Sequence, residues 1–289
     1  MPTPWEKEEF QKSRKWIRDS KSGSLTPIPC IGVWMDVCGF GSRLEEANWN
    51  LDILQSNGTL NLLSEVYQCV GHPFLVGVEP QPFENILILN DGIARTVDFH
   101  NTQYIHAVQA IFYIRDLVLG HLHLLRLTNF HDLGVRTVLA GGERIQYSAE
   151  TFTGNSILSH NEIPAEWGEK LLKKNFLYNP AEFQMNTAFA KAYSVDANGT
   201  SAGFNVNGFF IEQMFFDRFA SIPYITFTFT ETSIQLKYKD NIALELYVNI
   251  NKYFTYKGLN THVYGISTVR VDKTFEGEET IIDLVYDKK

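Results

Sequence analysis

Residues 84–99, "ENILILNDGIARTVDF", decide the fold predicted for this chain, because they hold two apolar runs separated by the turn Asn90-Asp91-Gly92. Gly and Asn tolerate the positive φ angle of a tight turn, so such a cluster between apolar runs is typical of a β-hairpin. The stretch therefore predicts two antiparallel strands with Asp91 at the tip between them.

Periodic patterns on both sides of the hairpin supply four more elements. Upstream, residues 31–36 predict a strand, and residues 44–69 carry the apolar spacing of a helix that the Asn-Gly pair at 57–58 can break. Downstream, residues 103–126 are helical in pattern and residues 134–140 predict a strand. The order strand, helix, strand, strand, helix, strand is that of the βαββαβ ferredoxin-like unit. We therefore predict an α+β fold with a ferredoxin-like core.

Shifts in composition along the chain predict three parts. Residues 1–27 hold a short amphipathic helix over residues 5–18 and a linker rich in Ser, Gly and Pro. The predicted core occupies residues 28–215 and includes a further helical pattern at 181–192. Residues 216–289 alternate β-branched and aromatic residues with polar ones, which predicts a strand-rich C-terminal extension.

Charge and composition exclude several classes of protein. The net charge of −8 argues against nucleic acid as a partner, because phosphate backbones are bound through surplus Lys and Arg. No apolar run approaches the roughly 18 residues of a membrane span, and the charged N-terminus lacks the apolar stretch of a signal peptide. We expect a cytoplasmic protein. Its cysteines, Cys30, Cys38 and Cys69, lack CxxC spacing, so neither a disulfide framework nor a zinc site is indicated.

The predicted topology brings two acidic residues together. In a ferredoxin-like sheet the first strand lies beside the third, so the end of strand 31–36 and the hairpin tip meet at one edge. Asp36 occupies the first place and Asp91 the second. Alone, either acid is more often a cap or a turn residue. Because two close carboxylates stay ionised at low cost only beside a cation, the pair favours a divalent metal site, with the backbone carbonyl of Val37 as a further ligand.

The turn after Asp36 has the composition of a phosphate-binding loop. Gly39, Phe40, Gly41 and Ser42 stand at the start of a predicted helix. Free backbone amides at such a position favour anionic groups, and glycine lets the backbone come close to them. A divalent cation at Asp36 would reverse the local sign of charge, so an acidic protein could still bind a polyanion.

The run "MDVCGFG" at 35–41 resembles the signature around the first metal-binding aspartate of class III nucleotide cyclases. In that family a second aspartate occupies the hairpin turn, as Asp91 does here. The run "QMNTAFAKAY" at 184–193 is similar to the family helix whose Asn and Arg contact the ribose and the transition state. The resemblance covers about residues 28–215. It implies a nucleotide cyclase with two divalent cations, Mn²⁺ or Mg²⁺, and an active site formed by a homodimer.

Two departures from the family pattern bear on the substrate. Purine cyclases carry a Lys shortly before the second Asp, where this chain has "ILIL" at 86–89. The family Arg, four residues after Asn186, falls on Ala190, with Lys191 one place on. In these respects the chain resembles the stand-alone pyrimidine cyclases of bacterial antiphage defence, which make cyclic UMP or cyclic CMP. The resemblance implies a pyrimidine nucleoside triphosphate as substrate, of which we favour UTP over CTP. It also implies Asn186 and Lys191 as catalytic residues and a downstream effector protein that binds the cyclic nucleotide.

Several other side chains have two interpretations each. Arg136 either reaches a phosphate or flanks its strand, and Arg95 either faces the base or makes a cross-strand pair. Both remain candidate substrate-binding residues. Trp34 and Tyr67 are expected in the core, and the aromatic run 209–219 is expected in the core or in a dimer interface.

Other functions are compatible with the same core. A cyclase that makes cyclic CMP or a purine cyclic nucleotide is the nearest alternative. A degenerate cyclase-like domain would bind nucleotides without converting them, which the displaced Arg position favours and the two acids oppose. A palm-type polymerase shares the βαββαβ core and paired acids, but the lack of surplus basic residues disfavours it.

Overall fold

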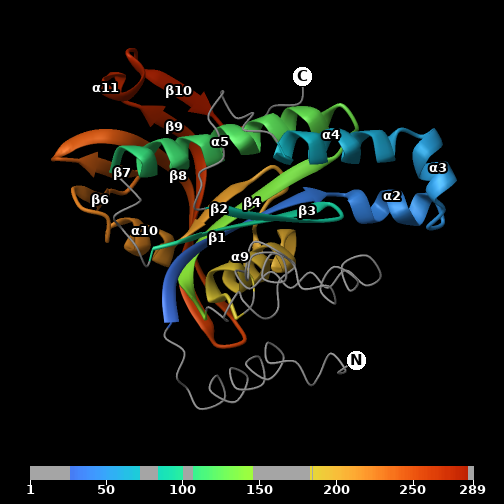
Figure 1. The fold of residues 1–289 in the computed structure, drawn as a ribbon, viewed down its shortest axis with the longest axis horizontal. Coiled ribbons are helices and arrows are strands. Elements are labelled where there is room, and N and C mark those ends of the chain that lie inside the picture. The colour runs from blue at the N-terminus through green and yellow to red at the C-terminus, as the bar shows by residue number, and fades with distance from the viewer. Residues whose placement is uncertain (1–26, 72–83, 100–106, 146–182, 184, 286–289) are drawn as a thin grey trace, which may run out of the picture. The chain divides into compact units, whose positions relative to one another are not determined.

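The structure is a computed structural model that describes residues 27–71, 84–99, 107–145, 183 and 185–285 (Figure 1). It divides into two compact units, Met1–Ile28 with Glu143–Asn186 and Pro29–Gly142 with Thr187–Lys289. The helices and strands described below belong almost entirely to the second unit. The helix predicted over residues 5–18 lies outside the described residues.

The second unit is an α+β structure built on one mixed sheet. The strands are β1 (Pro27–Cys38), β2 (Glu84–Leu89), β3 (Gly92–Asp98), β4 (Gly134–Ile145), β5 (Phe209–Glu212), β6 (Ile225–Phe229), β7 (Ser233–Tyr238), β8 (Asn241–Tyr256), β9 (Leu259–Val271) and β10 (Thr280–Asp283). The helices are α2 (Phe40–Glu46), α3 (Leu51–Ser56), α4 (Thr59–Gly71), α5 (Ala107–Asn129), α9 (Thr187–Asn198), α10 (Gln213–Phe219) and α11 (Lys273–Glu276). Along the sheet the order is β2-β3-β1-β4-β5-β9-β8-β7-β6, and β10 pairs with β9.

The predicted hairpin and its pairing with the first strand are confirmed. β2 and β3 are antiparallel neighbours whose last Cα pair is Leu89 with Gly92. Asn90 in the turn has a φ angle of 54°. Such a positive φ angle is what a tight hairpin turn requires and what Asn tolerates. β1 runs antiparallel to β3 on its other side, with Asp36 opposite Gly92. The end of β1 and the hairpin tip therefore share one edge of the sheet.

The single helical pattern at 44–69 is three helices in the structure, which corrects the predicted boundaries. The expected break at 57–58 is present, between α3 and α4. A second break precedes α3, where Asn48 and Trp49 have φ angles of 49° and 59° and the Asn50 side chain accepts hydrogen bonds from the first amides of α3. Apolar spacing does not reveal that Asn48 and Trp49 adopt the left-handed conformation. The sequence pattern therefore predicted a helix across both residues.

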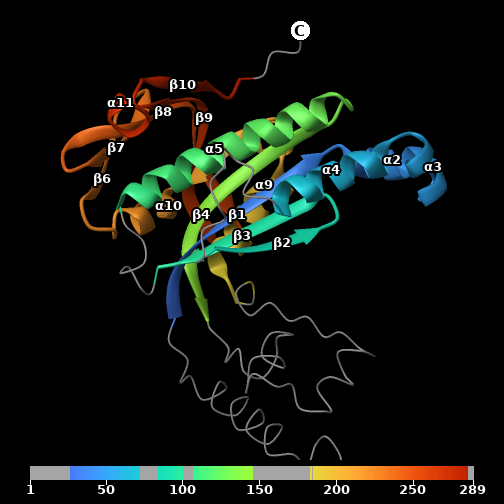
Figure 2. The ribbon, with the colours of Figure 1, turned by 45° about the horizontal axis from the view of Figure 1, so that its top comes forward.

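Helices cover both faces of the sheet, with α4 and α5 on one face and α9 on the other (Figures 1 and 2). Two glycines let α9 lie directly on the strands. A Cβ atom on Gly32 of β1 would come within 2.5 Å of the Phe189 backbone nitrogen, and one on Gly142 of β4 within 2.5 Å of the Ala188 nitrogen. Because Gly32 and Gly142 have no Cβ atom, the backbone of α9 can lie in direct contact with β1 and β4.

The C-terminal residues extend the same sheet. Three Cα pairs join β5 to β4 in parallel, from Thr137 with Phe209 to Leu139 with Ile211, and β5 is antiparallel to β9 on its other side. The aromatic run that ends in α10 is core, as expected, because Phe215, Phe216 and Phe219 are at most 1% exposed. The predicted strand-rich C-terminal part thus continues the sheet of the first six elements.

Candidate active site

Backbone hydrogen bonds hold Asp36 and Asp91 next to each other. Asp36 stands opposite Gly92 in the β1–β3 register, and the Val37 amide donates to the Asp91 carbonyl across 3.0 Å. From α4, the Tyr67 hydroxyl donates to the Asn90 carbonyl across 2.7 Å. Tyr67 is 37% exposed, so its expected place in the core is wrong; it braces the hairpin tip instead. The two acids that sequence spacing paired are neighbours in the structure.

A third carboxylate reaches the same face of β1. Trp34 precedes Asp36 by two residues, so both side chains lie on one face of the strand. The Trp34 ring covers Gly92, where a Cβ atom would lie 2.1 Å from the ring's Cη2 atom. From this position the indole Nε1 atom donates to Asp196 Oδ2 in α9 across 3.0 Å. Asp196 therefore belongs to the group of acids around Asp36.

Sequence reasoning missed Asp196, although a signal was present. Ala188, Ala192 and Asp196 follow one another at helical i, i+4, i+8 spacing, and all three are buried. A lone acid on the buried stripe of a helix requires a partner inside the protein. Which partner it has depends on the contact of α9 with β1 and β4, which no local pattern reveals.

Arg136 of β4 is engaged with Asp196. Its Nη1 atom donates to Asp196 Oδ1 across 2.8 Å and to the Asp196 carbonyl across 3.1 Å, while Nε donates to the Asn205 carbonyl across 3.3 Å. The side chains of Arg136 and Asp196 are only 7% and 9% exposed. The predicted contact of Arg136 with a phosphate stays a prediction, and the structure places this guanidinium in a buried ion pair.

Burial has the largest effect on the pKa values of the two acids, and neighbouring negative charge adds to it. Burial, followed by the charges of Asp196 and Asp91, raises the pKa of Asp36 to about 7, and Arg136 lowers it by less. Burial and the charge of Asp196 also raise the pKa of Asp91. The Cys38 thiol, two residues after Asp36, has its pKa raised to about 12, mainly by burial, and is protonated at neutral pH. Three carboxylates and one guanidinium thus influence one another electrostatically near the end of β1.

The donors present suit a hard divalent cation. Asp36 and Asp91 supply carboxylate oxygens, the ligands that hard divalent cations prefer, in a half-buried place where burial raises both of their pKa values. Within the described ranges no group of three or more His, Cys, Asp and Glu side chains is arranged to hold a metal ion. The ligand set predicted from the sequence is smaller in side chains, because it consists of two carboxylates and the Val37 backbone carbonyl. It stays a prediction.

The loop after β1 has the backbone of a tight turn. Gly39 has a φ angle of 94°, a conformation that costs glycine little, and α2 begins at the next residue. Gly39, Gly41 and Ser42 are exposed, whereas the Phe40 side chain is 6% exposed and belongs to the core. Only the backbone of Phe40 is therefore available to a ligand, and phosphate binding by this loop stays a prediction.

Arg95 makes the cross-strand pair that was one of its two interpretations. Its Nε and Nη2 atoms donate to the two Glu84 carboxylate oxygens across 2.6 and 2.7 Å, and the Tyr113 hydroxyl of α5 donates to Glu84 across 2.7 Å. The pair is buried, with side-chain exposures of 11% and 1%, rather than on the surface. It ties the hairpin to α5, and contact of Arg95 with a base stays a prediction.

Lys191 makes its contacts with Gly141 and Glu212, on β4 and β5. The Lys191 ammonium donates to the Gly141 carbonyl across 2.8 Å and lies 3.5 Å from Glu212 Oε1. Asn186 is buried directly before α9 and belongs to the first unit. The catalytic roles predicted for both residues stay predictions.

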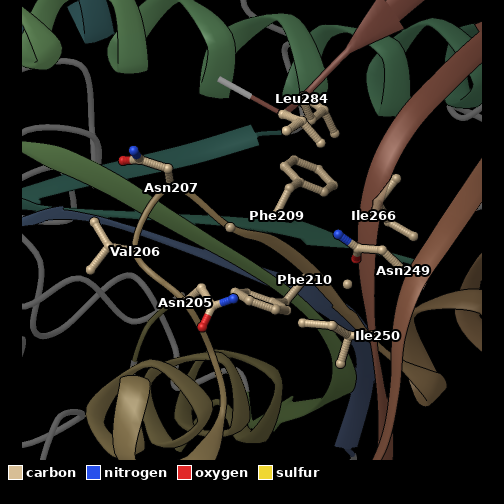
Figure 3. A pocket seen from close by; sticks show the side chains of 12 residues that line it. Asn205, Val206, Asn207, Phe209, Phe210, Asn249, Ile250, Ile266 and Leu284 are labelled. Atoms are coloured by element: carbon tan, nitrogen blue, oxygen red, sulfur yellow. The ribbon is translucent and has the colours of Figure 1, made fainter. Parts of the chain in front are cut away.

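A hollow elsewhere in the second unit is lined by none of the predicted site residues. Its volume is about 210 Å³, and it lies between β5, β8 and β9 (Figure 3). Figure 3 shows Phe209 directed toward Leu284 and Phe210 toward Ile250, as expected for successive residues of one strand. The acids at the end of β1 therefore form a separate site.

Other features of the chain agree with the composition. Cys30, Cys38 and Cys69 are not in disulfides; Cys30 is buried, and Cys38 and Cys69 are half-buried. Among the helices of the described segments, none is long and apolar enough to cross a membrane.

Comparison with known proteins finds likeness in structure but not in sequence. No family model matches the chain, and no curated protein matches it in sequence. The crystal structure of the guanylyl cyclase Cya2 aligns with 84% of this chain and 93% of that chain, at 12% identity and a TM-score of 0.46. An identity and a TM-score this low give no information on substrate or reaction. The function is therefore inferred from the residues of the site.

Proposed function

We propose that this chain is a metal-dependent nucleotide cyclase that converts UTP to 3',5'-cyclic UMP and pyrophosphate. The observation that carries the proposal is the placement of Asp36 and Asp91 side by side, through the Asp36–Gly92 register and the Val37–Asp91 hydrogen bond. The strand order β2-β3-β1-β4, which is that of a ferredoxin-like unit, supports it, as does the resemblance of the run at 35–41 to class III cyclases.

The reaction joins the ribose 3'-oxygen to the α-phosphorus of the same nucleotide. The hydroxyl loses its proton, the new phosphorus–oxygen bond forms, and the bond to the β-phosphate breaks to release pyrophosphate. Asp36, Asp91 and the Val37 carbonyl would hold the divalent cations, Mn²⁺ or Mg²⁺. Bound there, these cations supply the positive charge that acidifies the hydroxyl and neutralises the phosphates.

The chain's own groups would orient the substrate. The exposed amides of the turn at Gly39, Gly41 and Ser42 would bind phosphate oxygens at the start of α2. Asn186 would orient the ribose. Lys191 would stabilise charge at phosphorus only after leaving its contacts with Gly141 and Glu212. The family resemblance adds a homodimer, a downstream effector of the cyclic nucleotide and a role in antiphage defence to the proposal.

The test is incubation of the purified protein with each of the four ribonucleoside triphosphates and Mn²⁺, followed by mass spectrometry of the products. We expect cyclic UMP from UTP, and its loss in Asp36→Asn and Asp91→Asn. Asp240→Asn is the matched control, because Asp240 is exposed in a turn at a φ angle of 69° that Asn also tolerates. Absence of cyclic product from all four nucleotides would overturn the proposal, and product from CTP or a purine alone would change the base.

One observation favours a second candidate, a nucleotide-sensing domain without turnover. Ala190 stands at the family Arg position, and Lys191, one place on, donates to the Gly141 carbonyl and lies 3.5 Å from Glu212 Oε1. Such a domain would bind a nucleoside triphosphate in equilibrium dialysis and release no pyrophosphate. Pyrophosphate release in step with a cyclic product would exclude it.

A further inference from the structure

Asp196 and Arg136 form a buried, directly hydrogen-bonded ion pair near the two proposed metal ligands. The Arg136 guanidinium is held by three acceptors, namely the Asp196 carboxylate, the Asp196 carbonyl and the Asn205 carbonyl. The second carboxylate oxygen of Asp196 is held by Trp34 Nε1 at 3.0 Å. Because all of these side chains are buried, neither charge can be solvated by turning toward water.

This ion pair lies close to Asp36. Trp34 and Asp36 share one face of β1, and the Trp34 ring covers Gly92, the residue opposite Asp36. Asp196, hydrogen-bonded to that ring, therefore lies on the Asp36 side of α9. Its charge affects the pKa of Asp36 more strongly than the charge of Asp91 does, and Arg136 has the smaller effect.

The geometry points to Asp196 as a positioning residue that holds the Arg136 guanidinium away from Asp36 and Asp91, so that these two carboxylates keep their negative charge for a divalent cation. The inference rests on the proposed function. A buried guanidinium deprived of its carboxylate seeks the nearest other one, because an unpaired buried charge costs several kcal/mol. Asp36 and Asp91 are the carboxylates that the proposed site offers it, and an Arg that binds one of them bidentately would compete with a metal ion.

The charges account for why the pair is needed. In their ionised forms, Asp36, Asp91 and Asp196 carry three negative charges, and Arg136 carries one positive charge. When Asp196 takes up that positive charge, two negative charges remain on the proposed ligands, which equals the charge of one divalent cation. Without the Asp196 carboxylate, Arg136 would neutralise half of the charge that attracts the metal.

The experiment measures Mn²⁺ binding to the full chain by electron paramagnetic resonance of free Mn²⁺, without nucleotide. We expect wild-type protein to bind Mn²⁺, Asp36→Asn to lose binding, and Asp196→Asn to bind about tenfold more weakly or worse. The double variant Asp196→Asn/Arg136→Gln should recover affinity to within about threefold of wild type, because the competing cation is gone. Trp34→Phe, which removes a hydrogen bond of Asp196 but not its charge, should change the affinity little.

Each outcome decides between a charge role and a merely structural one. If the double variant binds Mn²⁺ as weakly as Asp196→Asn, or if Arg136→Gln alone weakens binding as much, Asp196 only anchors α9 and the inference is wrong. Unchanged affinity in folded Asp196→Asn would also overturn it, while Mn²⁺ binding by wild type would leave the proposed metal site standing. Wild-type protein that binds no Mn²⁺ would overturn the metal site and the inference together. Thermal melting of every variant separates loss of binding from loss of fold.

Discussion

The contact between Gly32 and α9 yields a sharp prediction about how the site is positioned. In Gly32→Ala, the new Cβ atom would lie 2.5 Å from the Phe189 nitrogen, 2.8 Å from the Ala188 carbonyl carbon and 2.9 Å from the Phe189 Cα atom. Ordinary contacts begin at 3.4 Å, so the shortest falls short by 3.4 − 2.5 = 0.9 Å. All three atoms are backbone, which cannot rotate away, so α9 must shift by about that distance.

Such a shift costs stability and disturbs the acids together. Overpacking of this kind costs about 1–3 kcal/mol, and in a protein of this size each kcal/mol lowers the melting temperature by about 2–4 °C. We therefore expect Gly32→Ala to melt roughly 2–12 °C below wild type. A displacement of 0.9 Å would also move the Asp196 carboxylate of α9 relative to Asp36 on β1, so the proposed cyclase activity should fall in the variant that remains folded.

The assay is urea unfolding followed by circular dichroism, with Gly41→Ala as the matched control. A Cβ atom on Gly41 would meet nothing within 4 Å, and the residue lies in helix α2, where Ala is favoured over Gly by about 0.5–1 kcal/mol. The control should therefore equal or exceed wild type in stability. Gly32→Ala with the wild-type free energy of unfolding would refute the described seating of α9 on β1.

Two further predictions concern charge. Because the pKa of Asp36 is raised to about 7 from 3.8, the native state retains a proton that the unfolded state releases, so metal-free protein should lose stability as pH rises from about 4 to about 7. Asp36→Asn should remove that part of the dependence, and equal slopes for variant and wild type in urea titrations at several pH values would contradict it. Arg95→Ala leaves Glu84 buried without its counter-charge and should cost about 3–5 kcal/mol, whereas Glu84→Gln/Arg95→Gln should cost less. Equal losses in urea unfolding would show that the buried charge is not the cause.

The strands and the meeting of Asp36 with Asp91 could be predicted because they follow from local turn chemistry and general pairing rules. The Asn90-Asp91-Gly92 turn forces a hairpin, and the order of elements then leaves β1 beside β3. The break before α3 could not be predicted, since it depends on Asn48 and Trp49 adopting positive φ angles that no apolar period reveals.

The remaining parts of the site depend on contacts between distant segments. Asp196 gains its partners only when α9 docks on glycine positions of β1 and β4. Lys191 finds Glu212 because β5 enters the sheet next to β4, and the sequence alone left the place of the C-terminal strands open. Residue types in the sequence can indicate a possible reaction, but tertiary contacts determine which charged side chains remain unpaired and able to take part in it.

The four-residue strand β5 decides how the chain can be shortened. It pairs with β4 on one side and, from Phe209 with Ile266 to Glu212 with Val263, with β9 on the other. A chain that ended at residue 215, the predicted end of the core, would leave the outer N–H and C=O groups of β5 unpaired and its phenylalanines uncovered. An open, apolar strand edge invites pairing between molecules. The C-terminal strands are thus the natural cover of that edge, and a truncated core would be expected to aggregate rather than work alone.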